Sequence, residues 1–332
     1  ESVDLVVTSP PYPMIEMWDR LFASFSPSIS GQIETGQGLR AFEQMHIALD
    51  PVWAELFRVI RPGGFACINI GDATRKIGDD FQLFSNHSRI TMEMVRLGFQ
   101  PLPVILWKKS TNAPNKFMGS GMLPAGAYVT LEHEYILIFR KGGKRAFKTA
   151  QEKQTRNESA MFWEERNRWF SDTWILKGTR QAINKKDIRD RNAAFTVELP
   201  FRLISMYSVK GDTVLDPFLG TGTTTAAAIS AGRDSIGFEC DTALDPLIRE
   251  TLIKTPEMSA RITSDRLSAH RTFVESRIKA GKTVKHVNEY YGFPVVTRQE
   301  KQLRFHQVSD VSAARLEQIE VRYSDTRDLS DM

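Results

Sequence analysis

The chain has 332 residues, of which 41% are hydrophobic and 25% are charged, fractions typical of a globular protein with one large domain or two smaller ones. Its two cysteines, Cys67 and Cys240, are too few for a disulfide framework, and its six scattered histidines lack the ligand spacing of a structural zinc site. No apolar run reaches the roughly 18 residues that a membrane span needs, and residues 1–4 do not resemble a secretory signal. We therefore expect a cytoplasmic, metal-free protein without a membrane partner.

Short apolar runs alternate with helical patterns along the first 240 residues. Strands are predicted at residues 3–7, 65–70, 104–107, 135–139, 213–215 and 235–238. Helices are predicted at residues 51–60 and 223–231, each followed by glycine. This alternation predicts an α/β fold with a mainly parallel sheet. Residues 104–107 and 135–139 are expected to form an antiparallel pair at one edge, joined by a loop over 110–130 that is a candidate for ligand contact.

Positive charge is concentrated in residues 141–191, which hold fourteen Lys and Arg residues against seven Asp and Glu residues. This stretch therefore carries +7, while the rest of the chain sums to about −3. Six aromatic residues are interleaved with these cations: Phe147, Phe162, Trp163, Trp169, Phe170 and Trp174. The pattern suits phosphate contact and base stacking, although a solvated surface above a few core aromatics gives the same composition.

The sequence changes character after residue 241. A long polar helix is predicted over residues 258–279, and mixed segments follow around 293–296 and 316–323. Residues 241–332 contain fifteen basic and fourteen acidic residues, so they do not predict a DNA-binding arm. We expect a mostly helical C-terminal extension of unknown role.

The segment from Thr213 to Thr225 combines a predicted strand, a Gly-x-Gly turn and the start of an Ala-rich helix. Gly220 and Gly222 in such a turn place backbone donors at a helix N-terminus, where a polar nucleotide can approach closely. Glu239 follows nineteen residues after Gly220, at the end of the next predicted strand. A carboxylate at that position can accept hydrogen bonds from both hydroxyls of a ribose.

The same segment excludes two common nucleotide motifs. Thr225 occupies the position at which a dinucleotide fingerprint needs a third glycine, and no Gly-Lys-Ser/Thr follows, as a P-loop would require. A nucleoside ligand without a pyrophosphate remains, and S-adenosyl-L-methionine fits. A plain strand-to-helix turn explains the glycines alone, but Asp216 and Glu239 at these spacings favour the ligand.

The second informative segment is Thr8-Ser9-Pro10-Pro11-Tyr12, which ends the first predicted strand. Pro10 and Pro11 fix φ and lack amide donors, so the turn holds its carbonyls rigidly. Ser9 Oγ and the Pro10 carbonyl can accept the two hydrogens of an exocyclic amino group, while Tyr12 stacks on the planar base. A proline-stiffened loop without a chemical role is the alternative interpretation of these residues taken alone.

Together, residues 8–12 and 216–224 resemble the catalytic and cofactor motifs of S-adenosylmethionine-dependent amino-DNA methyltransferases of the restriction-modification type. The catalytic motif precedes the cofactor motif, an order that resembles the β group of that family. Supporting stretches are similar in kind at residues 53–70, 105–109, 134–139 and 199–214, so the resemblance covers roughly residues 1–250.

The resemblance implies a Rossmann-like methyltransferase fold with permuted motif order, S-adenosyl-L-methionine as cofactor, double-stranded DNA as substrate, a cognate restriction endonuclease system and a prokaryotic cytoplasmic location. The implied catalytic residues are Ser9, Pro10, Pro11 and Tyr12. The implied cofactor-binding residues are Asp216, Phe218, Gly220, Gly222, Thr223 and Glu239. Phe195 and Glu198 fall at a further cofactor segment of the family, but Arg191-Asn192-Ala193-Ala194-Phe195 departs from the usual His-Pro-Ala-like pattern.

Ser9 favours the N4 amino group of cytosine as the target, since the family associates Ser at this position more often with N4-cytosine and Asp with N6-adenine. Neither Cys67 nor Cys240 lies in the Pro-Cys motif of C5-cytosine enzymes. We expect base flipping and direct methyl transfer. The alternatives are N6-adenine methylation, a structured RNA substrate and a catalytically inactive DNA-binding module, against which the intact Ser9, Tyr12, Asp216 and Glu239 argue.

These patterns divide the chain into four segments. Residues 1–140 are expected to form the catalytic half of the methyltransferase domain and residues 192–250 its cofactor-binding half. The basic insert, residues 141–191, is the candidate target-recognition region, with the loop at 110–130 and the extension at 251–332 as rivals. The family normally places a further strand and helix before its catalytic strand, so the chain is expected to be a fragment or to substitute its extension for them.

Overall fold

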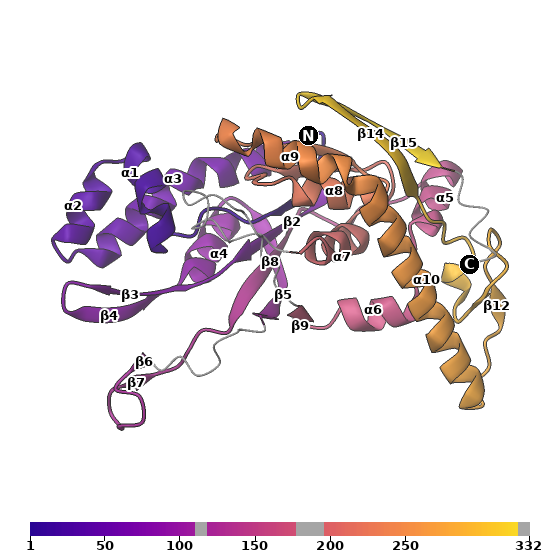
Figure 1. The fold of residues 1–332 in the computed structure, drawn as a ribbon, viewed down its shortest axis with the longest axis horizontal. Helices are drawn as coiled ribbons and strands as arrows, with labels where there is room; N and C mark the ends of the chain where they lie inside the picture. Colours follow the sequence, from indigo (N-terminus) through magenta and orange to yellow (C-terminus); the bar gives the residue numbers. More distant parts are fainter. Residues whose placement is uncertain (110–117, 177–195, 325–332) are drawn as a thin grey trace.

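A seven-stranded sheet forms the centre of the computed structural model, which describes residues 1–109, 118–176 and 196–324 (Figure 1). In spatial order its strands are β11 (Asp234–Gly237), β10 (Thr213–Asp216), β1 (Val3–Thr8), β2 (Ile60–Ile70), β8 (His133–Lys141), β5 (Phe99–Lys109) and β9 (Thr173–Leu176). All neighbours pair in parallel except β8, which is antiparallel to both β2 and β5. The predicted α/β fold with a mainly parallel sheet is confirmed.

The predicted antiparallel pair is β5 and β8, and it lies on the expected side of the sheet. One further strand lies outside it. This strand, β9, comes from the basic stretch and pairs in parallel with β5 from Leu106↔Thr173 to Lys109↔Leu176. The basic stretch therefore contributes directly to the central sheet.

Helices cover both faces of the sheet, because its interior strand β1 is apolar on both sides. Every residue of β1 is buried: Val6 packs with α3 and α4, whereas Leu5 and Val7 point to the other face and pack with α7 and α8. These helices are α3 (Gly38–Val59), α4 (Asn86–Arg96), α7 (Glu198–Tyr207) and α8 (Thr223–Ser230). In the described part of the chain, none of the helices has the length and apolar composition of a bilayer span.

Helix α3 is much longer than the predicted helix at 51–60, because it begins at Gly38. Pro51 therefore lies inside the helix rather than at its start, on an exposed position. Proline removes one intrahelical hydrogen bond, but a stripe of buried residues runs past it and fixes the helix to the sheet. That stripe consists of Ala41, Met45, Leu49, Trp53 and Leu56.

Several small elements that were not predicted lie around the edge of the sheet at which β1 ends. They are η1 (Glu16–Trp18), α1 (Asp19–Phe25), α2 (Ser28–Glu34), β3 (Ala73–Ile77), β4 (Asp80–Phe84), β6 (Met118–Gly119) and β7 (Ala127–Tyr128). The β6–β7 hairpin lies within the predicted loop at 110–130 and extends away from the sheet (Figure 1). Residues 110–117 of that loop lie outside the described residues.

The chain from residue 242 onward, which includes the C-terminal extension at 251–332, begins with helices and ends in hairpins. Its elements are η2 (Thr242–Leu244), α9 (Asp245–Ile253), α10 (Thr255–Lys279), β12 (His286–Val287), β13 (Pro294–Val295), η3 (Arg298–Glu300), β14 (Gln307–Arg315) and β15 (Gln318–Ser324). Helix α10 matches the helix predicted at 258–279. The hairpins were not predicted, and the extension is helical only in its first part.

The basic stretch and the C-terminal extension share one hydrophobic cluster. The basic stretch contains α5 (Ala150–Glu158) and α6 (Trp163–Trp169), and residues 177–191 of it lie outside the described residues. Phe162, just before α6, packs with Leu267 of α10 and with Tyr291, Val295 and Phe305. Two segments far apart in the sequence thus form one packed unit.

Candidate active site

The two predicted motifs meet at one edge of the sheet. Strands β1 and β10 are parallel neighbours with Leu5 opposite Val214, so their carboxyl ends lie side by side. There, Thr8 Oγ1 donates a hydrogen bond of 2.6 Å to Asp216 Oδ1, and both side chains are buried. We call residues 8–12 the catalytic turn and residues 216–224 the cofactor loop, after the predictions made for them. This bond joins the two segments, although Thr8 and Asp216 are 208 residues apart in sequence.

The side chains of the catalytic turn belong to a hydrogen-bond network that extends to β2 and β8. Tyr12 OH donates to Glu134 Oε2 at 3.0 Å, and Asn69 Nδ2 lies 2.8 Å from both of these oxygens. Ser9 Oγ lies 3.1 Å from Tyr12 OH. Lys109, at the end of β5, forms an ion pair with Glu134 Oε1.

The partners of Tyr12 determine the direction of each hydrogen bond. An ionised Glu134 only accepts, so the phenol must donate to it, and the amide of Asn69 must donate to the phenol oxygen. The second lone pair of Tyr12 can then accept only from Ser9. Asn69 Nδ2 also makes a long contact of 3.5 Å to Ser9 Oγ, so this arrangement leaves one lone pair of Ser9 Oγ free to accept from a substrate. Burial and the charge of Glu134 raise the pKa of Tyr12, which keeps the phenol protonated.

Within the turn, Ser9 is the side chain that keeps exposed surface. Pro10 and Pro11 are buried, and Tyr12 is 8% exposed, with Gly71 against one edge of its ring. A side chain at position 71 would place its Cβ 3.1 Å from Tyr12 Cε2, so this glycine permits the close approach. The hydroxyl of Tyr12 thus serves the network, a role that the sequence did not indicate.

The cofactor loop has the tight geometry that its glycines predicted. Gly220 and Gly222 adopt φ of +57° and +82°, which side-chain-bearing residues rarely adopt, and α8 begins at Thr223. Glu239 Oε2 accepts from the Gly220 amide at 2.9 Å, and Glu239 Oε1 accepts from the Asp241 amide at 2.8 Å. Glu239 therefore holds the loop, and each of its oxygens keeps a lone pair for a ligand hydroxyl.

Asp216 and Phe218 complete this loop. The Phe218 amide donates to Asp216 Oδ1 at 3.1 Å, and the Phe218 ring lies 6.2 Å from that of Trp53, measured between centroids. Burial raises the pKa of Asp216 to about 6, although the hydrogen bonds from Thr8 and Phe218 favour ionisation. A cationic ligand beside this carboxylate would stabilise its charged form. S-adenosyl-L-methionine carries an ammonium and a sulfonium, so the loop fits this cofactor.

The remaining site predictions have different outcomes. Phe195 lies outside the described residues. Glu198 begins α7, and its carboxylate forms an ion pair with Arg202 of the same helix. Asn69, Lys109 and Glu134 are site residues that the sequence analysis missed. Opposite charges at adjoining ends of the predicted antiparallel pair were the available signal for the last two.

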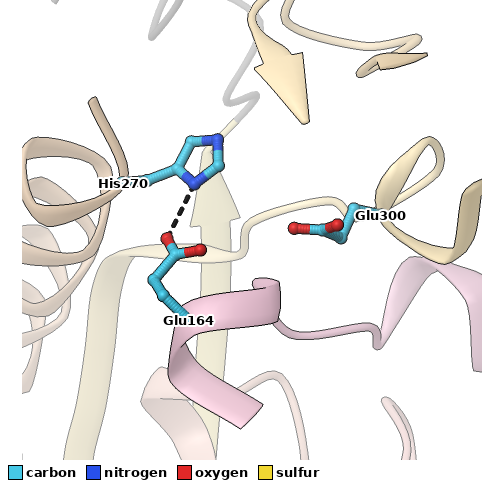
Figure 2. A group of neighbouring side chains, drawn as sticks. All are labelled: Glu164, His270 and Glu300. Atoms are coloured by element: carbon cyan, nitrogen blue, oxygen red, sulfur yellow. Dashed lines mark hydrogen bonds and ion pairs between the residues drawn. The ribbon is translucent and has the colours of Figure 1, made fainter. Parts of the chain in front are cut away.

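A second cluster of ionisable side chains lies away from this edge, between α6, α10 and η3 (Figure 2). His270 Nδ1 lies 2.7 Å from Glu164 Oε1, and His270 Nε2 lies 2.9 Å from the carbonyl oxygen of Pro294. A neutral imidazole donates from only one nitrogen, so these contacts favour the imidazolium. Burial opposes its charge, but Glu164 and Pro294 outweigh burial and raise the pKa of His270. An ion pair accounts for these contacts, and the expectation of a metal-free protein stays a prediction.

Comparison with known proteins decides the family of this chain. A family model described as DNA methylase, of the N6/N4 methyltransferase type, matches residues 3–248. The chain belongs to this DNA methylase family. The methylase is 53% identical over 308 residues to the type II methyltransferase M.MthZI of Methanothermobacter thermautotrophicus. This match covers 92% of this chain and 85% of M.MthZI. It is also 53% identical over 263 residues to the type II methyltransferase M.MjaI of Methanocaldococcus jannaschii. That match covers 76% of this chain and 86% of M.MjaI.

A solved structure supports the fold of the methylase. A protein of Thermus thermophilus, described as a DNA modification methylase and crystallised with S-adenosyl-L-methionine, superposes with a TM-score of 0.57 at 32% identity. The match covers 78% of this chain and 86% of that protein. The predicted family and the predicted methyltransferase fold are thereby confirmed. The family description joins N6 and N4 enzymes and does not choose between them.

Proposed function

We propose that this methylase transfers a methyl group from S-adenosyl-L-methionine to the exocyclic N4 amino group of cytosine in duplex DNA, as the modification enzyme of a type II restriction-modification system. The observation that carries the proposal is the Thr8–Asp216 hydrogen bond, which brings the Ser9 turn against the cofactor loop. The two type II relatives and the Thermus structure with S-adenosyl-L-methionine support the system and the cofactor.

The chain's own residues receive and orient the target amino group. An amino nitrogen of a paired base is inaccessible, so the base must leave the stack at a cost of a few kcal/mol. Ser9 Oγ, whose hydrogen points to Tyr12, and the Pro10 carbonyl then accept the two amino hydrogens. These bonds draw the nitrogen lone pair out of conjugation with the ring and aim it at the cofactor loop. S-adenosyl-L-methionine, when bound, supplies the activated methyl group.

The basic insert remains our candidate for target recognition, with a smaller set of residues than its composition suggested. Phe162, Trp169 and Trp174 are core residues and cannot stack on bases. Trp163 and Phe170 are exposed, and the flanking Arg166 and Arg168 are exposed on the same short helix. These residues, together with the exposed cations Lys144, Lys148, Lys153 and Arg156, are the described part of the insert that can meet DNA.

The experiment is incubation of the full chain with methyl-labelled S-adenosyl-L-methionine and unmethylated genomic DNA, followed by nucleoside digestion and mass spectrometry. N4-methylcytosine is expected. N6-methyladenine would overturn the choice of base and keep the site, because adenine offers the same kind of exocyclic amino group to Ser9 and Pro10. Label in RNA alone, or in neither nucleic acid, would overturn the DNA substrate.

Ser9→Ala tests the catalytic turn itself. Loss of the acceptor is expected to lower kcat by about tenfold to a hundredfold without changing the affinity for S-adenosyl-L-methionine. A rate within a factor of about two of the parent would remove Ser9 from its role.

A further inference from the structure

A small cavity lies at the opposite ends of the strands from the active site. Its volume is about 30 Å³, and it lies between the amino-terminal ends of β10 and β11, helix α10 and residues 304–306. Five cationic or basic side chains and one carboxylate line it: Lys210, Arg233, Arg266, Arg304, His306 and Glu158. The catalytic turn and the cofactor loop follow β1 and β10, so this cavity is separate from them.

Two arginines of the lining, Arg266 and Arg233, differ in whether a carboxylate is hydrogen-bonded to the guanidinium. Arg266 is paired with Glu165, with N–O distances of 2.6 and 2.8 Å. Arg233 is 5% exposed, and its hydrogen bonds go to neutral groups, the Ser208 hydroxyl at 3.0 Å, the Ser208 carbonyl at 2.7 Å and the Ala231 carbonyl. Arg233 therefore brings a buried positive charge that these partners do not neutralise.

Lys210 adds a second basic side chain, which carries a positive charge when it is protonated. In the described part of the chain its ammonium donates to one protein acceptor, the carbonyl of Arg304, although an ammonium has three donors. Burial and the charge of Arg233 lower the pKa of Lys210 to about 7. Its backbone is fixed, because the Lys210 amide donates to Ser159 Oγ at 2.9 Å. The ammonium is thus held at the cavity with donors to spare.

The other lining groups leave the cavity electropositive. Glu158 Oε1 accepts two hydrogen bonds of 3.0 Å, one from Tyr290 OH and one from Gln154 Nε2. The Arg304 guanidinium lies over the Tyr290 ring, 5.2 Å from its centroid. Among the described residues, His306 Nδ1 is buried without a hydrogen-bond partner. Glu158 is the one carboxylate in the lining, and Asp212, which interacts electrostatically with Arg233, is already paired with Arg145 at 2.6 Å. The lining therefore keeps an excess of positive charge, and uncompensated buried charge is costly.

We propose that this cavity binds a small tetrahedral oxyanion of the phosphate class. Such an anion offers several acceptor oxygens to the spare donors of Lys210 and to Arg304, and it neutralises the excess charge. A water needs about 10–15 Å³ of such space, so the cavity has room for more than one water. A free anion fits better than a DNA phosphate, because the cavity is small and Arg233 beside it is only 5% exposed.

The bound anion would connect three parts of the chain. Ser159 and Glu158 come from the end of α5, Lys210 and Arg233 precede β10 and β11, and Arg304 and His306 belong to the C-terminal extension. Binding there would therefore stabilise the docking of the extension on the methyltransferase core.

The test is calorimetric titration of inorganic phosphate into the full chain at neutral pH, with chloride at equal ionic strength as the reference. One phosphate per chain is expected. Lys210→Met and Arg304→Met should each weaken the phosphate Kd by at least about tenfold. Lys144→Met, which removes an exposed lysine outside the cavity, should leave Kd within about twofold.

The proposal is overturned if the parent shows no saturable binding beyond the chloride reference, or if Arg304→Met and Lys144→Met bind phosphate equally well. Arg304 is partly exposed, so its variant keeps the test open if Lys210→Met does not fold. A duplex oligonucleotide that displaces the phosphate would assign the cavity to the DNA backbone and overturn the free anion.

Discussion

Glu134 fixes which groups around Ser9 donate and which accept hydrogen bonds. It accepts from Tyr12 and Asn69 and is paired with Lys109, so its charge holds the phenol hydrogen away from Ser9. Without this acceptor, Tyr12 is free to donate to Ser9 Oγ and occupy the lone pair that the substrate needs. We therefore predict that Glu134 is a positioning residue for the proposed reaction, because it would act through Tyr12.

Glu134→Ala is expected to lower kcat by about tenfold and to leave KM for S-adenosyl-L-methionine within about twofold. Glu134→Gln retains one acceptor oxygen and should recover part of the rate. The control is Glu132→Ala, which removes a neighbouring carboxylate that pairs with Lys108 at 3.3 Å. Steady-state kinetics on duplex DNA measures both constants, and equal rates for Glu134→Ala and Glu132→Ala would contradict the network.

Glu239 is expected to contribute to cofactor binding in two ways, because it accepts hydrogen bonds from the Gly220 and Asp241 amides and stands at the position predicted to hold the ribose. Glu239→Ala should weaken S-adenosyl-L-methionine binding by about 1–3 kcal/mol. Calorimetry against Glu250→Ala, which removes a carboxylate paired with Lys254, provides the comparison. An unchanged Kd in Glu239→Ala would exclude the residue from the site.

The sequence pointed to those candidate-site residues that have unusual backbone chemistry, and it carried no local signal for the neighbours that the fold brings beside them. Ser9-Pro10-Pro11-Tyr12 and Gly220-Thr221-Gly222 stand out because prolines and positive-φ glycines restrict where they can occur. Asn69, Lys109 and Glu134 are ordinary residues at strand ends. Their role depends on which strands become neighbours, and that information is not local in sequence.

At the level of elements, the same distinction explains which predictions held. Strands β1, β2, β8 and β10 lie where apolar runs predicted them, because burial on both faces produces continuous hydrophobic segments. The edge strand β11 also lies close to its predicted place, although most of its residues are exposed. The start of α3 was missed, because Pro51 is a common first residue of a helix and here lies inside one. The small hairpins β3–β4 and β6–β7 carry no comparable core pattern.

We predict that the β6–β7 hairpin acts on DNA during the proposed base flipping. It arises between Lys109 and Glu134, whose ion pair lies beside Tyr12, and residues 118–130 contain no charged side chain. Met122 and Leu123 are 82% and 71% exposed at its tip. Exposed apolar side chains next to a flipping site can insert into the base stack and fill the space that the flipped base leaves.

A Met122→Ser/Leu123→Ser double variant should therefore methylate fully paired duplex about tenfold more slowly. With a mismatched target base, which is already partly unstacked, the loss should shrink to about twofold. Met92→Ser, a change at an exposed methionine of α4, serves as the control. A loss of equal size on both substrates would point to a general folding or binding defect and contradict the wedge.

At the level of the whole molecule, the four segments predicted from the sequence do not pack as four separate units. The basic insert is packed into both the methyltransferase sheet and the C-terminal extension. The basic insert places β9 in the central sheet and shares a hydrophobic cluster with the C-terminal extension. Composition separates segments by charge, but packing follows apolar surface, and the sequence carried no signal for this shared cluster. The extension is therefore expected to fix the orientation of α6, the helix of the insert that carries the proposed DNA contacts Trp163, Arg166 and Arg168.

The ion pair between His270 and Glu164 is the polar counterpart of that cluster. It joins α10 to α6, and Glu300 of η3 accepts from the Trp163 amide at 2.9 Å beside it (Figure 2). The pKa of His270 is raised above its ordinary value, so the pair stabilises the fold at pH values below that ordinary value. This contribution is lost as pH rises through the raised pKa. Stability of the docked extension should therefore decrease with increasing pH.

His270→Gln should lower the free energy of unfolding by about 3 kcal/mol near pH 6, because it leaves the Glu164 charge buried without its partner. The difference between parent and variant should narrow as pH rises towards about 9, since the parent also loses the imidazolium there. Urea unfolding followed by tryptophan fluorescence measures both values, with His286→Gln in β12 as the control. A difference that stays constant across this pH range would show that His270 contributes by packing against Phe162, 3.9 Å away between ring centroids, and not by charge.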